Sequence, residues 1–516
     1  MSDYDAIIIG GGHNGLICAA YLAKAGYSVC VLERQAVVGG AVITQEVVPG
    51  YKFDLGGSIV SLLNLTPIVD DLELGKYGYQ PIFLDPMFFS PYPDGSHLMF
   101  WRDVDRTCQS IAMLSPQDAE SYRRFVRDWQ PFLEVVIKSL HETPSPFNMA
   151  GTLGGGLLRH LPRTTKALGL ISKSMSGLLK HYFINPKLQA AIAWMGIQSG
   201  TGMDEPFGAM TAAWFITYHM KGLVHPRGGV GELTQSLARM IRAHGGMVLT
   251  NAEVAEIKVG AGQVSGVRLT SGDIITARKI VSATHIQTTL RLIAKPEVPL
   301  RKKIDGLDLG NGIGMAVRLA VHKLPNYLAH PGKLNSQHTA LQLIAPDMQY
   351  LRQAYADYTA GKFSKDPAVV AMTFSAIDPT LAPANKHTLY LWGQYFPYTL
   401  ADGKHWEVVC EEAANTMLNK LFEYAPNLRT MIIDKYIQTP PDIANLFGMP
   451  KANITHLPMT PARMFFMRPI PSLSQYRGPY KNLYLTGAST HPGGGILGLP
   501  GRNAAYVILE DFSKKH

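Results

Sequence analysis

Residues 5–15 read Asp-Ala-Ile-Ile-Ile-Gly-Gly-Gly-His-Asn-Gly and decide the fold of the first part of the chain. The β-branched run from Asp5 to Ile9 is short and ends at a glycine, which is typical of a buried parallel strand. The residue pattern predicts a helix over 16–24 and a second strand over 28–32. This order of strand, glycine loop, helix and strand predicts a βαβ unit of a doubly wound α/β domain.

Gly10, Gly12 and Gly15 give the loop the spacing GxGxxG. The first glycine permits a tight turn, the second lets the backbone approach a pyrophosphate, and the third lets the helix pack closely on the strand. Glu33 follows about 20 residues later, where a carboxylate accepts hydrogen bonds from a ribose. The loop therefore predicts a dinucleotide site in a Rossmann-like domain. A glycine-rich turn in some other α/β protein is the alternative.

The residues after Glu33 distinguish between the dinucleotides. Arg34 follows directly, and Gly39-Gly40-Ala41 come after a short spacer. This Glu-Arg-x4-Gly-Gly pattern is similar to that of the glutathione-reductase-like FAD superfamily. The segment Asp54-Leu55-Gly56-Gly57-Ser58 resembles the stretch that runs beside the flavin ring in amine-oxidase-like and desaturase-like members. We therefore expect FAD rather than NAD.

A second block, His225-Pro226-Arg227-Gly228-Gly229, is predicted to bring the chain back to the same domain. An amphipathic helix is predicted over 233–244, because its apolar residues recur at helical spacing. Strands are predicted over residues 247–250, 253–259, 264–269 and 279–283.

The C-terminal block is predicted to close the site. A strand over 482–486 leads through Gly487 into the string Thr490-His491-Pro492-Gly493 and a glycine-rich tail, and a helix is expected from about 502 to 512. Such a helix directs the positive end of its dipole at negative charge that develops on a flavin. The tail also matches GxGxxG, but Pro492 and a gap separate it from the strand and no acid follows, so we do not expect a second nucleotide site.

Together these blocks resemble the phytoene-desaturase-like flavoprotein family, which includes carotenoid desaturases, carotene isomerases and bacterial-type β-carotene ketolases. The ending Gly498-Leu499-Pro500-Gly501-Arg502-Asn503 is more similar to the ketolase and uncharacterised branch. The resemblance implies non-covalent FAD, since no cysteine lies near the C-terminal flavin segment. The residues that it assigns to FAD are Gly10, Gly12, His13, Asn14, Gly15, Glu33, Arg34, Gly39, Gly40, Ala41, Gly57, Ser58, Val254, Ala283, Gly487, Gly495, Ile496 and Leu497.

The implied reaction is hydride transfer to the flavin from a lipophilic, unsaturated substrate such as a polyene. Motif position places His491, His225 and Arg227 near the ring as catalytic candidates, although each is equally consistent with a structural role. Two alternatives remain: a flavin amine oxidase, and a non-redox isomerase or structural protein that retains FAD.

The remaining residues predict a second, α+β substrate domain inserted in the FAD domain. The FAD domain is expected to comprise residues 1–65, 225–290 and 469–516, and the substrate domain residues 66–224 and 291–468. In the insertions, strands are predicted over 314–321 and 388–393, and a helix over 406–425. The basic, apolar segment 153–180 is typical of a membrane surface, of a homodimer interface or of a core helix pair, and Pro162 is expected to interrupt it.

Composition narrows the function classes. The net charge of +9 is spread along the chain without a basic, aromatic-interleaved run, so no nucleic acid partner is expected. Only four cysteines occur, with no CxxC pair, which disfavours a metal site, a redox dithiol and a disulfide framework. The N-terminus has no basic region of a signal peptide, and no apolar run is long enough to span a bilayer. We expect a soluble or peripheral protein on the cytoplasmic side of the membrane.

Overall fold

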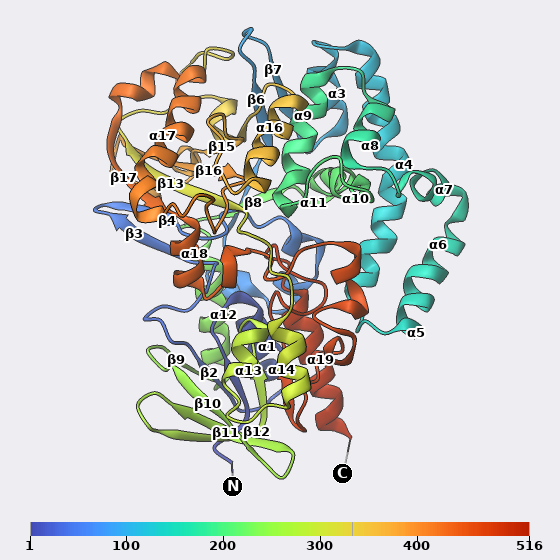
Figure 1. The fold of residues 1–516 in the computed structure, drawn as a ribbon, viewed down its shortest axis with the longest axis vertical. Helices are drawn as coiled ribbons and strands as arrows, with labels where there is room; N and C mark the ends of the chain where they lie inside the picture. Colours follow the sequence, from blue (N-terminus) through green and yellow to red (C-terminus); the bar gives the residue numbers. More distant parts are fainter. Residues whose placement is uncertain (1, 333, 515–516) are drawn as a thin grey trace.

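A computed structural model describes residues 2–332 and 334–514. Two seven-stranded sheets organise the chain, and two short two-stranded ladders lie apart from them. Figure 1 shows the first sheet in the lower part of the molecule, beside both chain ends, and the second sheet in the upper part. The chain passes between these parts several times.

The lower sheet has the order β10-β11-β12-β1-β2-β9, and β18 pairs with β12. Strands β18, β12, β1, β2 and β9 are parallel, whereas β10, β11 and β12 form an antiparallel ladder. The strands are β1 (Tyr4–Ile9), β2 (Val29–Leu32), β9 (Met247–Leu249), β10 (Val254–Gly260), β11 (Gln263–Leu269), β12 (Ile274–Ser282) and β18 (Leu483–Leu485).

Helices cover both faces of this sheet, which is why β1 reads as a continuous apolar run. Ile8 packs in one core cluster with α1 (His13–Lys24), α12 (Gly231–Ala243) and α19 (Leu499–Ser513). Ile7 faces the opposite way, toward residues of α13 (Ile286–Arg291) and α14 (Val298–Asp305). The predicted Rossmann-like α/β fold is confirmed.

The ends of some predicted elements differ from those observed. Helix α19 begins at Leu499, three residues before the predicted start, because Pro500 is tolerated in a first helical turn. Strand β12 begins at Ile274 because its first half pairs with β11 before its second half joins β1.

The upper sheet has the order β17-β13-β16-β15-β14-β6-β7. It joins strands of both predicted insertions, since β14 pairs in parallel with β6. Helix α17 (Trp406–Tyr424) packs on it in one apolar cluster with β13 and β16. The predictions for 314–321, 388–393 and 406–425 are confirmed. The strands are β6 (Phe88–Pro91), β7 (His97–Phe100), β13 (Gly314–Val321), β14 (Leu341–Ile344), β15 (Val369–Met372), β16 (His387–Gln394) and β17 (Ile432–Gln438).

A helical region follows β7, and the long helix α4 (Pro116–Leu140) is its centre. The buried carboxylate of Asp118 accepts the backbone N–H groups of Ile184 and Asn185, at 3.0 and 2.8 Å, and so ties α4 to the start of α9. The other helices here are α3 (Val104–Ala112), α5 (Pro146–Asn148), α6 (Gly155–Arg159), α7 (Leu161–Leu170), α8 (Met175–Tyr182), α9 (Pro186–Gly196), α10 (Ala209–Ala213) and α11 (Thr217–Lys221).

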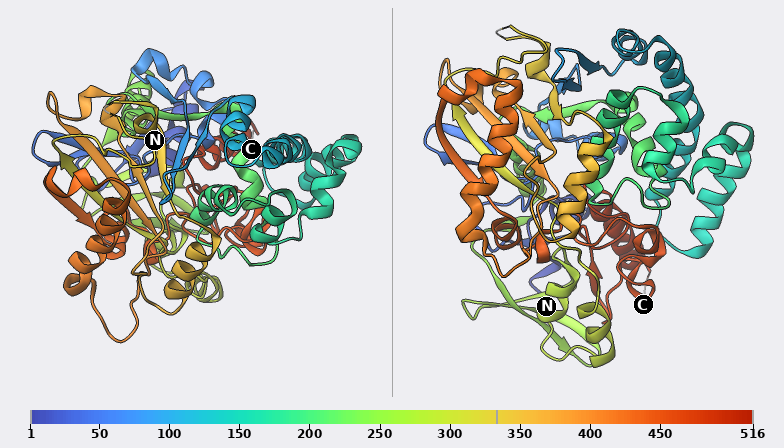
Figure 2. Two further views of the ribbon diagram at one scale, coloured as in Figure 1. Left: turned by 90° about the horizontal axis from the view of Figure 1, so that it is seen from above. Right: turned by 45° about the horizontal axis from the view of Figure 1, so that its top comes forward.

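Helices α5, α6 and α7 form an arm at the side of the molecule, and both views of Figure 2 show it projecting from the body. The chain turns between α6 and α7, and Pro162 lies in the first turn of α7, as predicted. The arm is attached through α4, because a Cβ on Gly156 would lie only 2.8 Å from Cγ1 of Val135.

Two short ladders complete the fold between the sheets: β3 (Thr44–Val48) with β4 (Tyr51–Asp54), and β5 (Pro81–Leu84) with β8 (Leu223–Pro226). The remaining helices are α2 (Ile68–Asp71), α15 (Ser336–Thr339), α16 (Met348–Thr359) and α18 (Pro440–Phe447). Among the described residues, no helix combines the length and apolarity that a bilayer crossing requires.

Candidate flavin site and adjoining cavity

A cavity of about 1060 Å³ runs from the glycine loop after β1 to the upper sheet. At one end it is lined by residues of the loop and of α1, such as Gly12 and Asn14. At the other end it is lined by β13, β15 and β16, with Ala316, Met372 and Leu391 among the lining residues. One continuous space therefore reaches both sheets.

The glycine loop has the geometry that its sequence predicts. Gly10 has a φ of +98°, which is open to glycine and strained for other residues. A Cβ on Gly15 would lie 2.3 Å from the carbonyl oxygen of Gly10, so only glycine lets α1 pack this closely. A Cβ on Gly12 would meet no atom within 4 Å, and this position opens into the cavity.

Glu33 lies at the end of β2 and lines the cavity, with 7% of its surface exposed. Its Oε2 accepts the N–H of Gly11 at 2.7 Å, and its Oε1 accepts the N–H of Gln35 at 2.9 Å. These two bonds fix the carboxylate beside the glycine loop, where the sequence predicts a ribose partner.

The phosphate end of the cavity has polar atoms without a partner in the protein. His13 Nε2 and Asn14 Oδ1 are buried and form no hydrogen bond, and both residues line the cavity at the start of α1. Burial lowers the pKa of His13 to about 4, so its ring is neutral at physiological pH. The backbone N–H groups of the first helical turn have no side-chain cap either. These features fit the pyrophosphate of a dinucleotide.

All of the residues predicted to contact FAD line this cavity except Gly39. Gly39 instead supports the loop, because its N–H donates to the carbonyl oxygen of Gly11 at 2.8 Å. The predicted C-terminal residues meet the N-terminal ones: a Cβ on Gly57 would lie 2.5 Å from Cδ1 of Ile496. Helix α19 begins directly after the lining residues, at Gly498, and its first turn has no side-chain cap.

None of the three predicted catalytic residues lines the cavity. His491 is fully buried, both of its ring nitrogens lack a partner, and burial together with the Arg468 charge lowers its pKa to about 3. Arg227 is exposed at the surface. His225 is buried and stacks on Phe374, with ring centroids 4.0 Å apart. Their structural surroundings account for all three without contact with a substrate.

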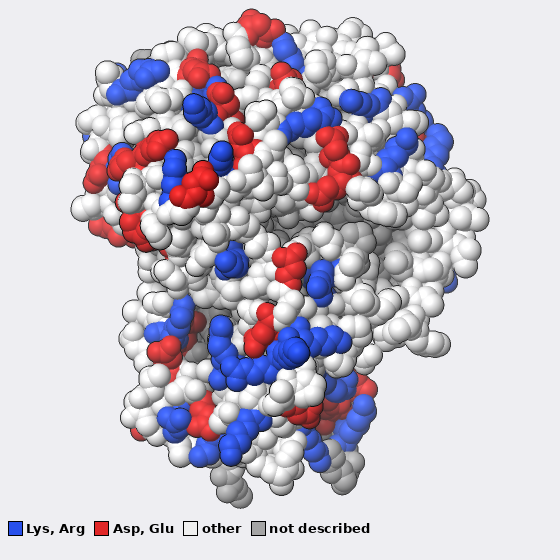
Figure 3. Space-filling view, in the orientation of Figure 1, with Lys and Arg blue, Asp and Glu red and all other residues white. Residues whose placement is uncertain are grey.

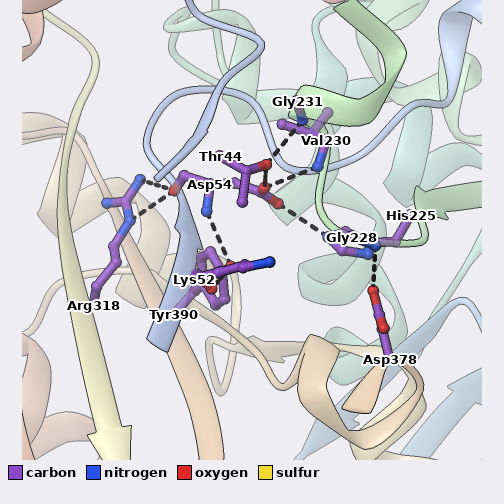
Figure 4. Close-up of polar contacts among 10 residues, drawn as sticks. All are labelled: Thr44, Lys52, Asp54, His225, Gly228, Val230, Gly231, Arg318, Asp378 and Tyr390. Carbon is purple, nitrogen blue, oxygen red and sulfur yellow. Dashed lines mark hydrogen bonds and ion pairs between the residues drawn. The ribbon is translucent and has the colours of Figure 1, made fainter. Parts of the chain in front are cut away.

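His225 belongs to a buried polar cluster centred on Asp54, at the end of β4 (Figure 4). Its Nε2 lies 3.0 Å from one carboxylate oxygen of Asp54. The other oxygen accepts the N–H of Val230 at 2.9 Å and the hydroxyl of Thr44 at 2.6 Å. The cluster joins the hairpin β3–β4 to the segment after β8, so the Asp54–Ser58 stretch is held firmly beside the cavity.

Sequence motifs did not point to several lining residues. Thr455 and His456 lie in the loop before the last block, and the His456 ring is 5.1 Å from that of His285, another lining residue. Burial, with the neighbouring His285 and Arg468, holds the pKa of His456 well below its usual value. Arg318 and Tyr390 come from the upper sheet. None carries a local motif, and the fold alone brings them to the cavity.

The four cysteines form no disulfide, and the described residues contain no group of three or more His, Cys, Asp or Glu side chains able to hold a metal ion. The chemistry of the site therefore has to be read from its nucleotide-binding features and its apolar lining.

A Rossmann-like sheet whose glycine loop opens into a large, partly apolar cavity defines a dinucleotide-dependent redox protein. Residues 15–342 match the family of flavin containing amine oxidoreductases, and the chain belongs to this family. It is an FAD-dependent oxidoreductase.

Relatives cover almost the whole chain. The rat pyridine nucleotide-disulfide oxidoreductase domain-containing protein 2 is 33% identical over 99% of this chain and 94% of its own length. A limonene dehydrogenase polypeptide of Castellaniella defragrans is 27% identical, with 98% and 95% covered. A neurosporene-forming phytoene desaturase of Cereibacter sphaeroides is 27% identical, with 97% and 93% covered. The predicted resemblance to the phytoene-desaturase-like family is confirmed.

The same fold occurs in solved amine oxidases. Cyclohexylamine oxidase from Brevibacterium oxydans superposes with a TM-score of 0.59 at 17% identity, over 99% of this chain and the whole of the other. At this identity the likeness concerns the fold alone.

Proposed function

We propose that this protein binds FAD non-covalently and oxidises a lipophilic, unsaturated substrate by hydride transfer to the flavin. The observation that carries the proposal is the single cavity that joins the glycine loop to an apolar chamber. A cofactor at one end and an apolar substrate at the other would share one enclosed space.

The chain's own residues suit the two ends of FAD. Glu33 and Val254 line the cavity at the carboxyl end of β2 and the start of β10, where ribose and adenine would lie. Gly57, Ser58 and Ile496 line it nearer the upper sheet, where the ring would lie. When bound, FAD supplies the two-electron acceptor, and the uncapped first turn of α19 would stabilise negative charge on it.

The chamber beyond the expected flavin ring is built mainly from apolar side chains. They come from the helical region and from the upper sheet, so the chamber reaches across both. Among them are Val136, Leu140, Met195, Met210, Val370 and Met372. Such a lining excludes water and binds a substrate through its apolar surface. The printed names of two relatives, a limonene dehydrogenase and a phytoene desaturase, are consistent with this substrate class.

The arm α5–α7 offers a route for such a substrate from a membrane surface. Phe147, Leu158 and Leu161 are 86%, 71% and 42% exposed on it. From residue 143 to residue 203 the chain has no acidic residue, while basic residues begin at Arg159. The face of the arm visible in Figure 3 carries few charged side chains, and the surface is hollowed beside it. An apolar surface with basic neighbours is suited to an anionic bilayer.

The test is the absorbance spectrum of the purified protein, recorded without oxygen while a lipid extract is added. We expect an oxidised flavin spectrum that bleaches as substrate reduces it, and flavin that is released by denaturation because it is not covalently bound. A protein that takes up no flavin even with added FAD would contradict the cofactor assignment. Flavin that no lipid fraction reduces, but that an amine reduces, would contradict the substrate class.

A further inference from the structure

Two arginines of the described chain are buried, and their surroundings differ. Arg468 directs its guanidinium at backbone carbonyl groups, and all three of its nitrogens donate hydrogen bonds. It does not line the cavity. Arg468 therefore has the contacts of a structural residue that ties together the loops before the last block.

Arg318, on β13, is 3% exposed and lines the cavity. Its Nε and Nη2 donate to the carbonyl oxygen of Asp54 at 3.0 and 2.9 Å, and Nη2 also donates to that of Leu55 at 2.9 Å. These bonds use three of the five N–H groups of the guanidinium. Nη1 is buried and has no hydrogen-bond partner, and Figure 4 shows it turned away from Asp54.

The charge of Arg318 also lacks a direct counter-ion. Its partners are neutral carbonyl groups, and the Asp54 carboxylate is engaged by His225, Val230 and Thr44. Burial lowers the pKa of Arg318 to about 10, against the raising effect of Tyr390 and Asp54, so the group remains charged at neutral pH. A buried cation with two open N–H groups costs free energy unless a ligand meets it.

Other polar groups of the chamber are already satisfied within the protein. The amide of Gln394 donates to the carbonyl oxygen of Ile197 and accepts from Trp392, and the hydroxyl of Tyr390 accepts the N–H of Asp54. Of the buried cavity-lining side chains described, those with unpaired polar atoms are His13, Asn14 and Arg318. The first two belong to the phosphate end. Arg318 lies at the other end, on the upper sheet.

We propose that Arg318 binds the carboxylate of the substrate, which is an apolar, unsaturated chain with an acidic end rather than a pure hydrocarbon. This inference rests on the proposed function, since it assigns the apolar chamber to the same substrate. The carboxylate would accept hydrogen bonds from Nη1 and supply the missing negative charge. Its apolar chain would lie against the side chains of the chamber.

The test is binding to the flavin-loaded protein, followed by the change in flavin absorbance. The probes are an eighteen-carbon unsaturated acid, its methyl ester and the matching alkene, all below their aggregation concentrations. The wild type is expected to bind the acid about tenfold to a hundredfold more tightly than the alkene, because hydrogen bonds to a charged group have that effect. In Arg318→Met this preference is expected to disappear while alkene binding remains.

Lys52→Met is the matched control, since Lys52 is an exposed cation on β4 and its loss changes the net charge equally. It is expected to leave the acid preference unchanged. If Arg318→Met does not fold, Arg318→Gln keeps an amide donor for the Asp54 carbonyl group while it removes the charge.

Three results would overturn the proposal. The first is equal binding of acid and alkene by the wild type, which needs no variant. The second is an acid preference that persists without Arg318. The third is loss of flavin from the Arg318 variants with the acid preference intact, which would assign the residue to the cofactor. A wild-type protein that binds neither flavin nor any probe would instead contradict the proposed function.

Discussion

Gly12 and Gly15 belong to the same loop but differ in what surrounds them. Gly12 has φ −70° and ψ 164°, which any residue adopts, and a Cβ there would meet no protein atom. Gly12→Val is therefore expected to fold normally and to lose FAD, because its side chain fills the phosphate end of the cavity. The measurement is the flavin content of the purified variant together with its far-ultraviolet circular dichroism.

Gly75→Val is the matched control for this variant, because a Cβ on the exposed Gly75 would also meet no atom within 4 Å. It is expected to retain flavin. Gly15→Val should instead disturb the packing of α1, since the carbonyl oxygen of Gly10 blocks its Cβ. A flavin-loaded Gly12→Val protein would show that the loop does not bind phosphate.

Buried histidines predict that the protein loses stability in mild acid. Burial lowers the pKa of His13 and His285 to about 4 and, with Arg468, that of His491 to about 3. In the unfolded chain histidine has a pKa of about 6.5, so the unfolded state gains protons first as the pH falls below that value. At pH 5 each residue is expected to lower the free energy of unfolding by about 2 kcal/mol relative to pH 7.

The check is the thermal midpoint at pH 7 and at pH 5. His491→Leu removes one of the buried rings and is expected to reduce the loss between these pH values, whereas His160→Leu, at an exposed position, should not. A wild-type midpoint that stays constant down to pH 5 would contradict the prediction.

At the residue scale, the sequence predicted the cofactor end well and the substrate end poorly. The glycine loop and Glu33 are a local signal, because a short chain segment forms the whole phosphate site. Arg318 and His456 reach the cavity from distant segments, and no local spacing marks them. His225 and His491 lie in genuine motifs but are buried in the supporting structure, and sequence alone does not separate support from contact.

At the element scale, the arm α5–α7 is the part whose role is most readily tested. Phe147→Ser with Leu158→Ser removes its most exposed apolar side chains. This double variant is expected to bind anionic vesicles several-fold more weakly than the wild type, because burial of each large apolar side chain contributes about 1.5–3 kcal/mol. Sedimentation with phosphatidylglycerol vesicles measures the bound fraction.

Val408→Ser on α17 is the control, since Val408 is 80% exposed on a different helix. It should bind vesicles as the wild type does. If the wild type does not bind vesicles but the double variant changes its mass in solution, the arm is a subunit interface and not a membrane surface.

The predicted elements follow a simple rule about pattern. Strands β1, β13 and β16 and helices α12 and α17 were predicted because each has a strong apolar period or run. The hairpin β6–β7 was not predicted. Its residues are buried on both faces, so no alternation marks them, and it is a strand pair only because β14 pairs with β6.

At the scale of the whole molecule, FAD would contact three distant parts of the chain. The cavity lining comes from residues 9–62, from 252–292 and from 443–497, together with the chamber residues. A ligand that binds only the folded state stabilises it, by about 2.7 kcal/mol at a concentration of one hundred times its dissociation constant. We therefore expect FAD removal to loosen these segments together, although they are far apart in sequence.

Hydrogen exchange of the flavin-free and flavin-loaded protein measures this coupling. Peptides over residues 10–15, 454–459 and 492–498 are expected to exchange more slowly with FAD bound, because all three line one cavity. Helix α17 serves as the internal control, since no lining residue belongs to it and its apolar face packs on the upper sheet. Protection confined to the glycine loop would mean that the C-terminal block forms independently of the cofactor. Protection of all three segments, with α17 unchanged, would mean that the bound cofactor links the chain segments that build the site.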